Sequence, residues 1–151
     1  MIEERLRELG IELPPPPSAV ASYVPVRVSG SLAFVAGQVP LVEGEMLHPG
    51  KLGTDISVEQ GAEAARRCAL QALAALREAL GSLDRVRGIV QVSVFVASAA
   101  GFTDESKVAN GASDLLVEVF GDAGRHARAA VGVAELPLGA SVEVALIAEI
   151  G

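Results

Sequence analysis

Hydrophobic residues recur along the chain with two kinds of spacing, which together predict the order of helices and strands. Intervals of three and four residues predict helices over 1–9, 57–80 and 104–120. Alternating or continuous runs of Val, Ile and Ala predict strands over 23–29, 32–36, 86–97, 128–133 and 142–150. Residues 43–53 predict a loop or short hairpin. This order predicts an α+β domain in which two helices cover one face of a mixed sheet.

Residues at the ends of these segments support the boundaries. Ser57 and Gln60 have the spacing of a capping box at the start of the long helix. Gly30 and Ser31 predict a two-residue hairpin turn with glycine first. Pro25 lacks a backbone donor, so the first strand is expected at the edge of the sheet or beginning after it.

The strand over 86–97 is apolar on both of its faces. Its alternation places Val90, Val92, Val94 and Val96 on one face, with Ile89 and Phe95 on the other. Two helices cannot cover both faces of a sheet, and an uncovered apolar face usually marks an interface. The pattern therefore predicts an oligomer.

Length and charge narrow the class of protein. A chain of 151 residues suits one domain, 1–151, in which 1–22 form an N-terminal helix and a proline-rich lead-in. The net charge of −7 disfavours a nucleic-acid partner, because such proteins usually carry a basic patch. No apolar run reaches transmembrane length and the charged N-terminus does not resemble a signal peptide, so we expect no membrane partner and a cytoplasmic location.

Few residues are available to hold a metal ion. Cys68 is the only cysteine, which excludes an internal disulfide and a cysteine-based zinc site. His48 and His126 are the only histidines, too few for a metal site, and none is assigned. Cys68 lies beside the apolar stripe of its helix, and we predict a small core residue rather than a nucleophile.

Two charged residues interrupt the apolar C-terminal strands. Arg128 shares a face of its strand with Ala130, and Glu143 shares a face of the next strand with Ala145. A guanidinium among small side chains costs free energy unless it meets an anion. That anion is Glu143, in a buried structural ion pair, or a bound ligand, or both.

The residues around this pair resemble a known family. Residues 126–149 are similar to the C-terminal signature of the RidA (YjgF/YER057c/UK114) family, roughly P-A-R-x-x-V-x-V-x-x-L-P followed by V-x-V/I-E-I/V. The matching residues, which keep the family's spacing from Arg to Glu, are Ala127, Arg128, Val131, Val133, Leu136, Pro137 and Glu143. Upstream, 37–40 resemble the family's S-G-Q-I/V-P, and Tyr23 stands at the expected distance before them. Residues 83–96 are similar to its G-L-x-D-I-V-K-x-x-V-F-V segment, so the likeness covers about 23–150.

The resemblance implies a chorismate mutase-like fold and a homotrimer with its sites in the three clefts between subunits, in a longer RidA-like subgroup. It also implies an enamine/imine deaminase of the 2-iminobutanoate/2-iminopropanoate type. Such a hydrolase converts reactive 2-aminoacrylate-type intermediates to 2-oxo acids and ammonia, and needs no metal or cofactor.

The family's residue roles transfer to matching positions here. Arg128 would hold the carboxylate of an imino or 2-oxo acid, and Glu143 would orient or deprotonate the attacking water. The backbone carbonyl near Ala130 would help Glu143. The remaining residues expected to line the cleft are Tyr23, Asn110, Gly37 and Gln38.

Several positions depart from the family pattern. Ala36 stands where members commonly have Ser, Ala145 where they have a second Glu, and His126 where they have Pro. The interval from Asn110 to Arg128 is one residue longer than usual. Three alternatives stay open: a trimer that binds a small carboxylate or metabolite and has another activity, a ribonuclease or translation inhibitor, and a purely structural trimer.

Overall fold

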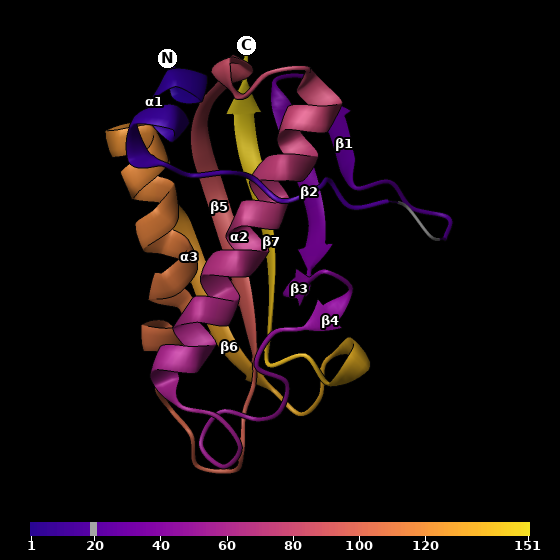
Figure 1. The fold of residues 1–151 in the computed structure, drawn as a ribbon, viewed down its shortest axis with the longest axis vertical. Helices are drawn as coiled ribbons and strands as arrows, with labels where there is room; N and C mark the ends of the chain where they lie inside the picture. Colours follow the sequence, from indigo (N-terminus) through magenta and orange to yellow (C-terminus); the bar gives the residue numbers. More distant parts are fainter. Residues whose placement is uncertain (19–20) are drawn as a thin grey trace.

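The computed structural model describes residues 1–18 and 21–151; Ala19 and Val20, within the predicted N-terminal lead-in, lie outside the described residues. Helices lie on one face of a five-stranded sheet, in two layers (Figure 1). The sheet order is β1-β2-β7-β5-β6, and β3 and β4 form a separate hairpin. The strands are β1 (Val26–Ser29), β2 (Leu32–Gln38), β3 (Leu41–Val42), β4 (Glu45–Met46), β5 (Val86–Ala97), β6 (Ala127–Val133) and β7 (Val142–Ile150).

The sheet is mixed, as predicted. β5 and β6 run parallel, and every other pair in the five-stranded sheet is antiparallel. β1 is an edge strand that begins at Val26, directly after Pro25, so Tyr23 lies outside it. The prediction of a strand starting at Tyr23 is therefore wrong, for the reason that Pro25 signalled. Gly30 has a φ of 60° in the β1–β2 turn, as a glycine-first hairpin turn requires.

Two long helices, α2 (Val58–Leu80) and α3 (Glu105–Phe120), cover the sheet. α2 begins with the predicted capping box, in which Ser57 and Gln60 bond reciprocally, and ends at Gly81. The two helices approach closely at Gly111, where a Cβ would collide with the backbone carbonyl of Ala62. The short 3₁₀ helices are η1 (Leu83–Arg85), η2 (Gly121–Gly124) and η3 (Pro137–Gly139).

The N-terminal helix α1 (Ile2–Leu9) is docked against the rest of the domain. Leu6 is buried, and Glu3 forms an ion pair with Arg77 of α2 at 2.7 Å. Glu3 also accepts a hydrogen bond from the backbone N–H of Leu83 at 2.8 Å. Burial raises the pKa of Glu3, but the bonds from Arg77 and Leu83 outweigh it, and the pKa is lowered overall. The tertiary contacts stabilise a helix too short to persist alone.

The core lies between the sheet and the two long helices, and none of the described helices covers the opposite face of the sheet (Figure 1). Bulges at Arg87 and Val90 shift the register of β5 against β7. Val90 is consequently 44% exposed while Ile89 is buried, so the predicted alternation is wrong at these two positions. Val92, Val94 and Val96 are buried as predicted. Cys68 is also buried in this core, as predicted.

The uncovered face carries apolar side chains from four strands. Register places Phe34, Phe95, Val131, Ala145 and Ile147 on it. Phe34 and Val131 are 41% and 45% exposed. We call this surface the open face. None of the described helices is both long and apolar enough to span a bilayer.

Candidate functional site

Arg128 lies on β6, the edge strand next to α3, and its guanidinium is tied to that helix. Nη1 donates to Asn110 Oδ1 at 2.8 Å and to Ser113 Oγ at 3.1 Å. Nη2 donates to the backbone carbonyl of Ser106 at 3.5 Å. All of these acceptors are neutral, and no ion pair joins Arg128 to a carboxylate within residues 1–18 and 21–151. The positive charge of Arg128 is therefore oriented but not neutralised.

This arrangement leaves one edge of the guanidinium for a ligand. An arginine has five N–H donors, one on Nε and two on each terminal nitrogen. Asn110 and Ser113 occupy both donors of Nη1, so the edge formed by Nη1 and Nη2 cannot grip a carboxylate with two bonds. Nε has no acceptor among the described residues and Nη2 has only the long 3.5 Å bond to Ser106, so the edge formed by Nε and Nη2 is available to the two oxygens of one carboxylate.

Glu143 lies on β7, on the open face, and its carboxylate lies against Gly37 of β2. A Cβ at position 37 would collide with that carboxylate, so glycine is required for this packing. Burial raises the pKa of Glu143, because desolvation penalises its charged form. A half-buried carboxylate with a raised pKa is a stronger base than an exposed one and fits a role in proton transfer.

Arg128 and Glu143 project from opposite faces of the sheet. Arg128 is in register with Val92, which is in register with Leu146 of β7, so these three side chains share the helix-covered face. Glu143 is three residues from Leu146 and projects from the opposite face. β5 also lies between the two strands. The hypothesis of a buried structural pair within one chain is therefore wrong.

The other predicted site residues divide between these two halves. Asn110 is an exposed residue of α3 that bonds Arg128 directly, and Ala130 shares the face of Arg128 on β6. Gly37 contacts Glu143. Gln38 ends β2, after a register shift against β7 between Val35 and Gln38, but it is buried, and its amide nitrogen donates to the Ala36 carbonyl at 3.0 Å. Tyr23 is 51% exposed before β1, away from either set of bonds.

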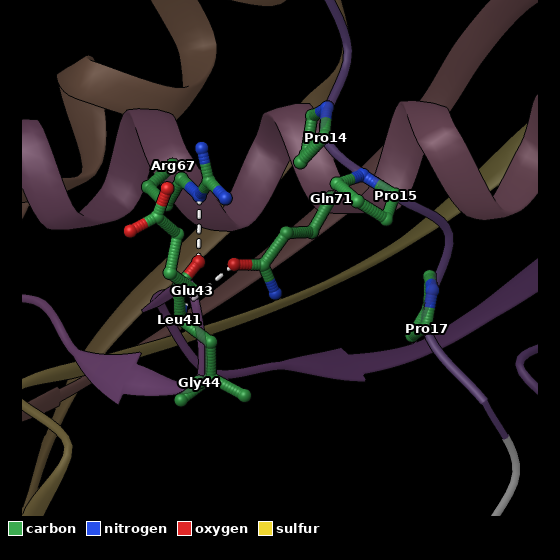
Figure 2. A pocket seen from close by; sticks show the side chains of 8 residues that line it. All are labelled: Pro14, Pro15, Pro17, Leu41, Glu43, Gly44, Arg67 and Gln71. Atoms are coloured by element: carbon green, nitrogen blue, oxygen red, sulfur yellow. Dashed lines mark hydrogen bonds between the residues drawn. The ribbon is translucent and has the colours of Figure 1, made fainter.

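Gln38 belongs to a network that holds the β3–β4 hairpin on α2. Gln71 of α2 donates to the Val39 carbonyl at 2.8 Å and to Gln38 Oε1 at 3.4 Å, and it accepts from the Leu41 N–H at 2.8 Å. Arg67 adds a bond from Nε to the Leu41 carbonyl at 2.8 Å. Figure 2 shows both α2 side chains reaching toward Leu41.

The proline run completes a cavity of about 200 Å³ beside this network. Pro14, Pro15 and Pro17 form one wall, opposite the hairpin (Figure 2). The network stabilises the end of β2 and so the position of Gly37. Gln38 thus has a structural role here, and its predicted contact with substrate stays a prediction.

Sequence reasoning missed Ser113 as a partner of Arg128. Ser113 follows Asn110 by three residues, and side chains at that spacing lie on one face of a helix. That spacing was the available signal, because the predicted helix already contained both residues. Ser113 also lines a surface cavity of about 260 Å³ beside Arg128, together with Asp114, Val117, Arg125 and His126.

Other reactive groups contribute little to these sites. Burial raises the pKa of the Cys68 thiol well above its usual value, and the nearby Glu143 charge adds to the effect, so the thiolate nucleophile is disfavoured. Among residues 1–18 and 21–151, no three His, Cys, Asp or Glu side chains gather closely enough to hold a metal ion. Arg128 and Glu143 therefore remain the main candidates for binding and transforming a polar ligand.

Comparison with known proteins places this arrangement in context. Residues 3–150 match the family described as "YjgF/chorismate_mutase-like, putative endoribonuclease". The chain is 47% identical to Protein TCP17 of Trypanosoma cruzi over 99% of this chain and 94% of that protein. The structure of a "putative endoribonuclease" from Shewanella oneidensis MR-1 is 37% identical, has a TM-score of 0.94 and covers 99% of both chains. E. coli TdcF with bound serine is 25% identical, with a TM-score of 0.63, over 90% of this chain and 94% of that one.

Proposed function

The chain belongs to the YjgF/chorismate mutase-like (RidA) family, and from this premise we propose that it is an enamine/imine deaminase acting on small 2-imino acids. The observation that carries the proposal is the combination of two groups. Arg128 is oriented, lacks a carboxylate partner among the described residues, and has only the long bond to Ser106 on its Nε and Nη2 edge. Glu143 is half-buried with a raised pKa. An anion anchor and a base are the two groups that hydrolysis of an imino acid requires.

Arg128 binds the substrate carboxylate through its Nε and Nη2 edge. A planar guanidinium forms two parallel bonds with a carboxylate, which a lysine cannot reproduce. TdcF, a relative at 25% identity, is seen with bound serine, a small molecule that carries such a carboxylate. The anchor fixes the imine carbon relative to the base.

Glu143 acts on water. The carboxylate takes a proton from the water as its oxygen adds to the C=N carbon, and Glu143 then passes that proton to the nitrogen, which gives a neutral carbinolamine. The regenerated carboxylate moves the hydroxyl proton of the carbinolamine to its nitrogen in the same way. The resulting carbinolamine then loses ammonia as the C–N bond breaks and the C=O bond forms. The backbone carbonyl near Ala130 helps to orient this water. The raised pKa of Glu143 makes it a better proton acceptor, and activity is expected to rise with pH through that pKa.

The two halves meet on one ligand only if they come from different subunits, since they project from opposite faces of one sheet. We therefore place the site between subunits of a homotrimer whose open faces pack on neighbours. The apolar open face and the unpaired β6 edge both support this assembly, because each needs a partner.

A matched pair of variants tests the assembly. Phe34→Glu places a charge on the open face and is expected to reduce the mass measured by light scattering from three times 15.4 kDa to the monomer value. Val28→Glu is the control: Val28 is 45% exposed, on the same hairpin, but is in register with Ala33 of the buried face, and should leave the trimer intact. A wild-type monomer would refute the intersubunit site.

The activity is tested with an imine made in situ. A dehydratase acting on serine or threonine releases the enamine or imine, and added protein should accelerate formation of 2-oxo acid and ammonia above the spontaneous rate. Glu143→Gln at the same concentration is the control for non-specific buffering. Wild-type protein that gives no acceleration would refute the proposal, and tight binding of a 2-oxo acid without turnover would favour the alternative of a carboxylate-binding trimer.

The family description also names endoribonucleases, and this alternative makes a separate prediction. The net charge of −7, the lack of tryptophan and the single tyrosine disfavour a surface that binds and stacks RNA bases. We expect no RNA cleavage above the buffer control at low salt. Cleavage that purifies with the protein and is lost in Arg128→Ala would support the ribonuclease alternative. Ala36 and Ala145 depart from the residues common in the family, so the preferred imino acid has to be found by comparing substrates in the same assay.

A further inference from the structure

Arg128 is connected to a chain of hydrogen bonds that continues past Ser113. Ser113 Oγ lies 2.8 Å from Nε2 of His126, and Nδ1 of the same ring lies 2.6 Å from the backbone carbonyl of Gly124. Ser113 Oγ also accepts from Arg128 Nη1 at 3.1 Å. The chain links the guanidinium to a backbone atom of η2, which packs against α3.

The direction of each bond follows from the groups involved. A carbonyl oxygen can only accept, so Nδ1 of His126 carries a hydrogen and donates to Gly124. In a neutral ring Nε2 then has no hydrogen and accepts from the Ser113 hydroxyl. The serine oxygen is left to accept from Arg128. Each donor has one acceptor, and the ring is fixed in the tautomer with hydrogen on Nδ1.

This order determines which arginine donors are available. Ser113 and Asn110 each take one hydrogen of Nη1, and neither can donate to Arg128 in its place. Without Ser113, Nη1 regains a free hydrogen and the guanidinium can rotate about its last bonds. The Nε and Nη2 edge would then be one of several orientations, and a carboxylate would bind after an ordering step that costs free energy.

We propose that Ser113 and His126 are positioning residues that saturate Nη1 of Arg128 and reserve its Nε and Nη2 edge for the carboxylate of the substrate. The proposal rests on the proposed function, since it assigns a role in binding the same 2-imino acid. It also gives a role to His126 at a position where the family signature has proline, which lacks a side-chain donor or acceptor. Neither residue touches the reacting atoms, so both act on binding and not on the chemical step.

The tautomer of His126 is the first test, and it needs no substrate. The chain has two histidines, so ¹⁵N-histidine spectra of wild type and of His48→Asn assign the His126 ring without ambiguity. At a pH where the ring is neutral, a pyridine-type Nε2 and a pyrrole-type Nδ1 are expected. The opposite tautomer would overturn the proposal, whether or not the protein is a deaminase.

Kinetics are the second test. Ser113→Ala and His126→Phe should each raise KM for the imine, and Kd for a 2-oxo acid, roughly tenfold while kcat changes little. Ser113→Ala removes one bond to the charged Arg128, and His126→Phe removes the acceptor that orients the Ser113 hydroxyl. Ser113→Thr keeps the hydroxyl and should restore wild-type binding. His48→Asn is the matched control: His48 lies in the loop after β4, outside the chain of bonds, and should behave as wild type.

The outcomes separate this proposal from the proposed function. If wild type neither binds 2-oxo acid nor hydrolyses imine, the proposed function fails. The hydrogen-bond chain is then tested by the tautomer of His126 alone. If wild type is active and Arg128→Ala loses binding while folded Ser113→Ala and His126→Phe keep wild-type KM, the positioning role is overturned. A loss of kcat equal to the rise in KM would also overturn it, because such residues would be acting on the reaction itself.

Discussion

The two halves of the candidate site are built in different ways. The Arg128 half is ordered by hydrogen bonds that the guanidinium donates to side chains of α3, all within one chain. The Glu143 half has a carboxylate on an apolar open face, packed against Gly37 and destabilised in its charged form by burial. The cation is thus held in place before a ligand arrives, while the acid is held at a raised pKa. In the proposed function, binding would depend on orientation in the first half and catalysis on desolvation in the second.

The largest effect on turnover is expected from a substitution at Glu143. Glu143→Gln keeps the shape of the side chain and removes the base, so kcat is expected to fall roughly 10²–10⁴-fold while the Kd for a 2-oxo acid is unchanged. Steady-state kinetics and titration calorimetry on the same preparation measure both quantities. A variant that retains wild-type kcat would remove Glu143 from the reaction.

Although Glu143→Gln should lower turnover, it should not lower the stability of the fold at pH 7. The folded pKa of Glu143 is raised, so its effect on the unfolding free energy is most favourable below the unfolded pKa and is lost as pH rises through the folded pKa. Glu143→Gln removes that loss and should melt at or slightly above the wild-type temperature at pH 7. A large drop in melting temperature would instead indicate a structural carboxylate.

Arg128→Ala should affect the other half only. We expect Kd for a 2-oxo acid to rise roughly 100-fold, because a bidentate charged contact is lost, with little change in melting temperature. Arg128→Lys keeps the charge without the fork and should recover only part of the affinity. The changes in unfolding free energy caused by Arg128→Ala and Glu143→Gln should be additive in the double variant, since the residues do not contact each other within a chain. An Arg128→Ala variant that binds the 2-oxo acid with the wild-type Kd would remove Arg128 from carboxylate binding.

Gly37→Ala tests the packing of the Glu143 carboxylate without changing either charged residue. The added Cβ would occupy the place of the Glu143 carboxylate, a flexible group that can move. The variant should fold, since φ at this position is not in the left-handed region, and lose roughly tenfold in kcat with unchanged binding. Gly139→Ala, where a Cβ meets open space but φ is 73°, should cost stability and leave kcat unchanged. Equal kcat losses in both variants would argue against a specific effect on Glu143.

The smallest effect on turnover is expected far from both halves, at Glu3. Its folded pKa is lowered by Arg77 and Leu83, so its contribution to stability is present above the unfolded pKa and is lost as pH falls through the folded pKa. Glu3→Gln should therefore lower the melting temperature at pH 7 by more than at pH 3, and leave kcat and KM unchanged. Equal destabilisation at both pH values would contradict this ion-pair linkage.

The features that the sequence predicted correctly are those set by nearby residues. Ser57, Gln60 and Gly81 bound α2 through local hydrogen bonds and glycine conformation, which a sequence displays directly. The faces of Arg128 and Glu143 within their own strands followed from alternation.

The features that it missed depend on pairing between distant segments. The bulges at Arg87 and Val90 arise from the register of β5 against β7, and no local pattern marks them. The separation of Arg128 from Glu143 depends on β5 lying between β6 and β7, although those two strands are consecutive in sequence. The bond from Ser113 to Arg128 also required knowing which helix lies beside β6.

In the proposed trimer, each site combines Arg128 of one subunit with Glu143 of another. Co-expression of Arg128→Ala and Glu143→Gln chains with different tags, followed by purification of mixed trimers, tests it directly. In a cyclic trimer that contains both kinds of chain, one of the three clefts receives both intact residues, so about one third of wild-type imine hydrolysis should return. Each variant alone should stay inactive. Mixed trimers as inactive as the single variants would contradict the claim.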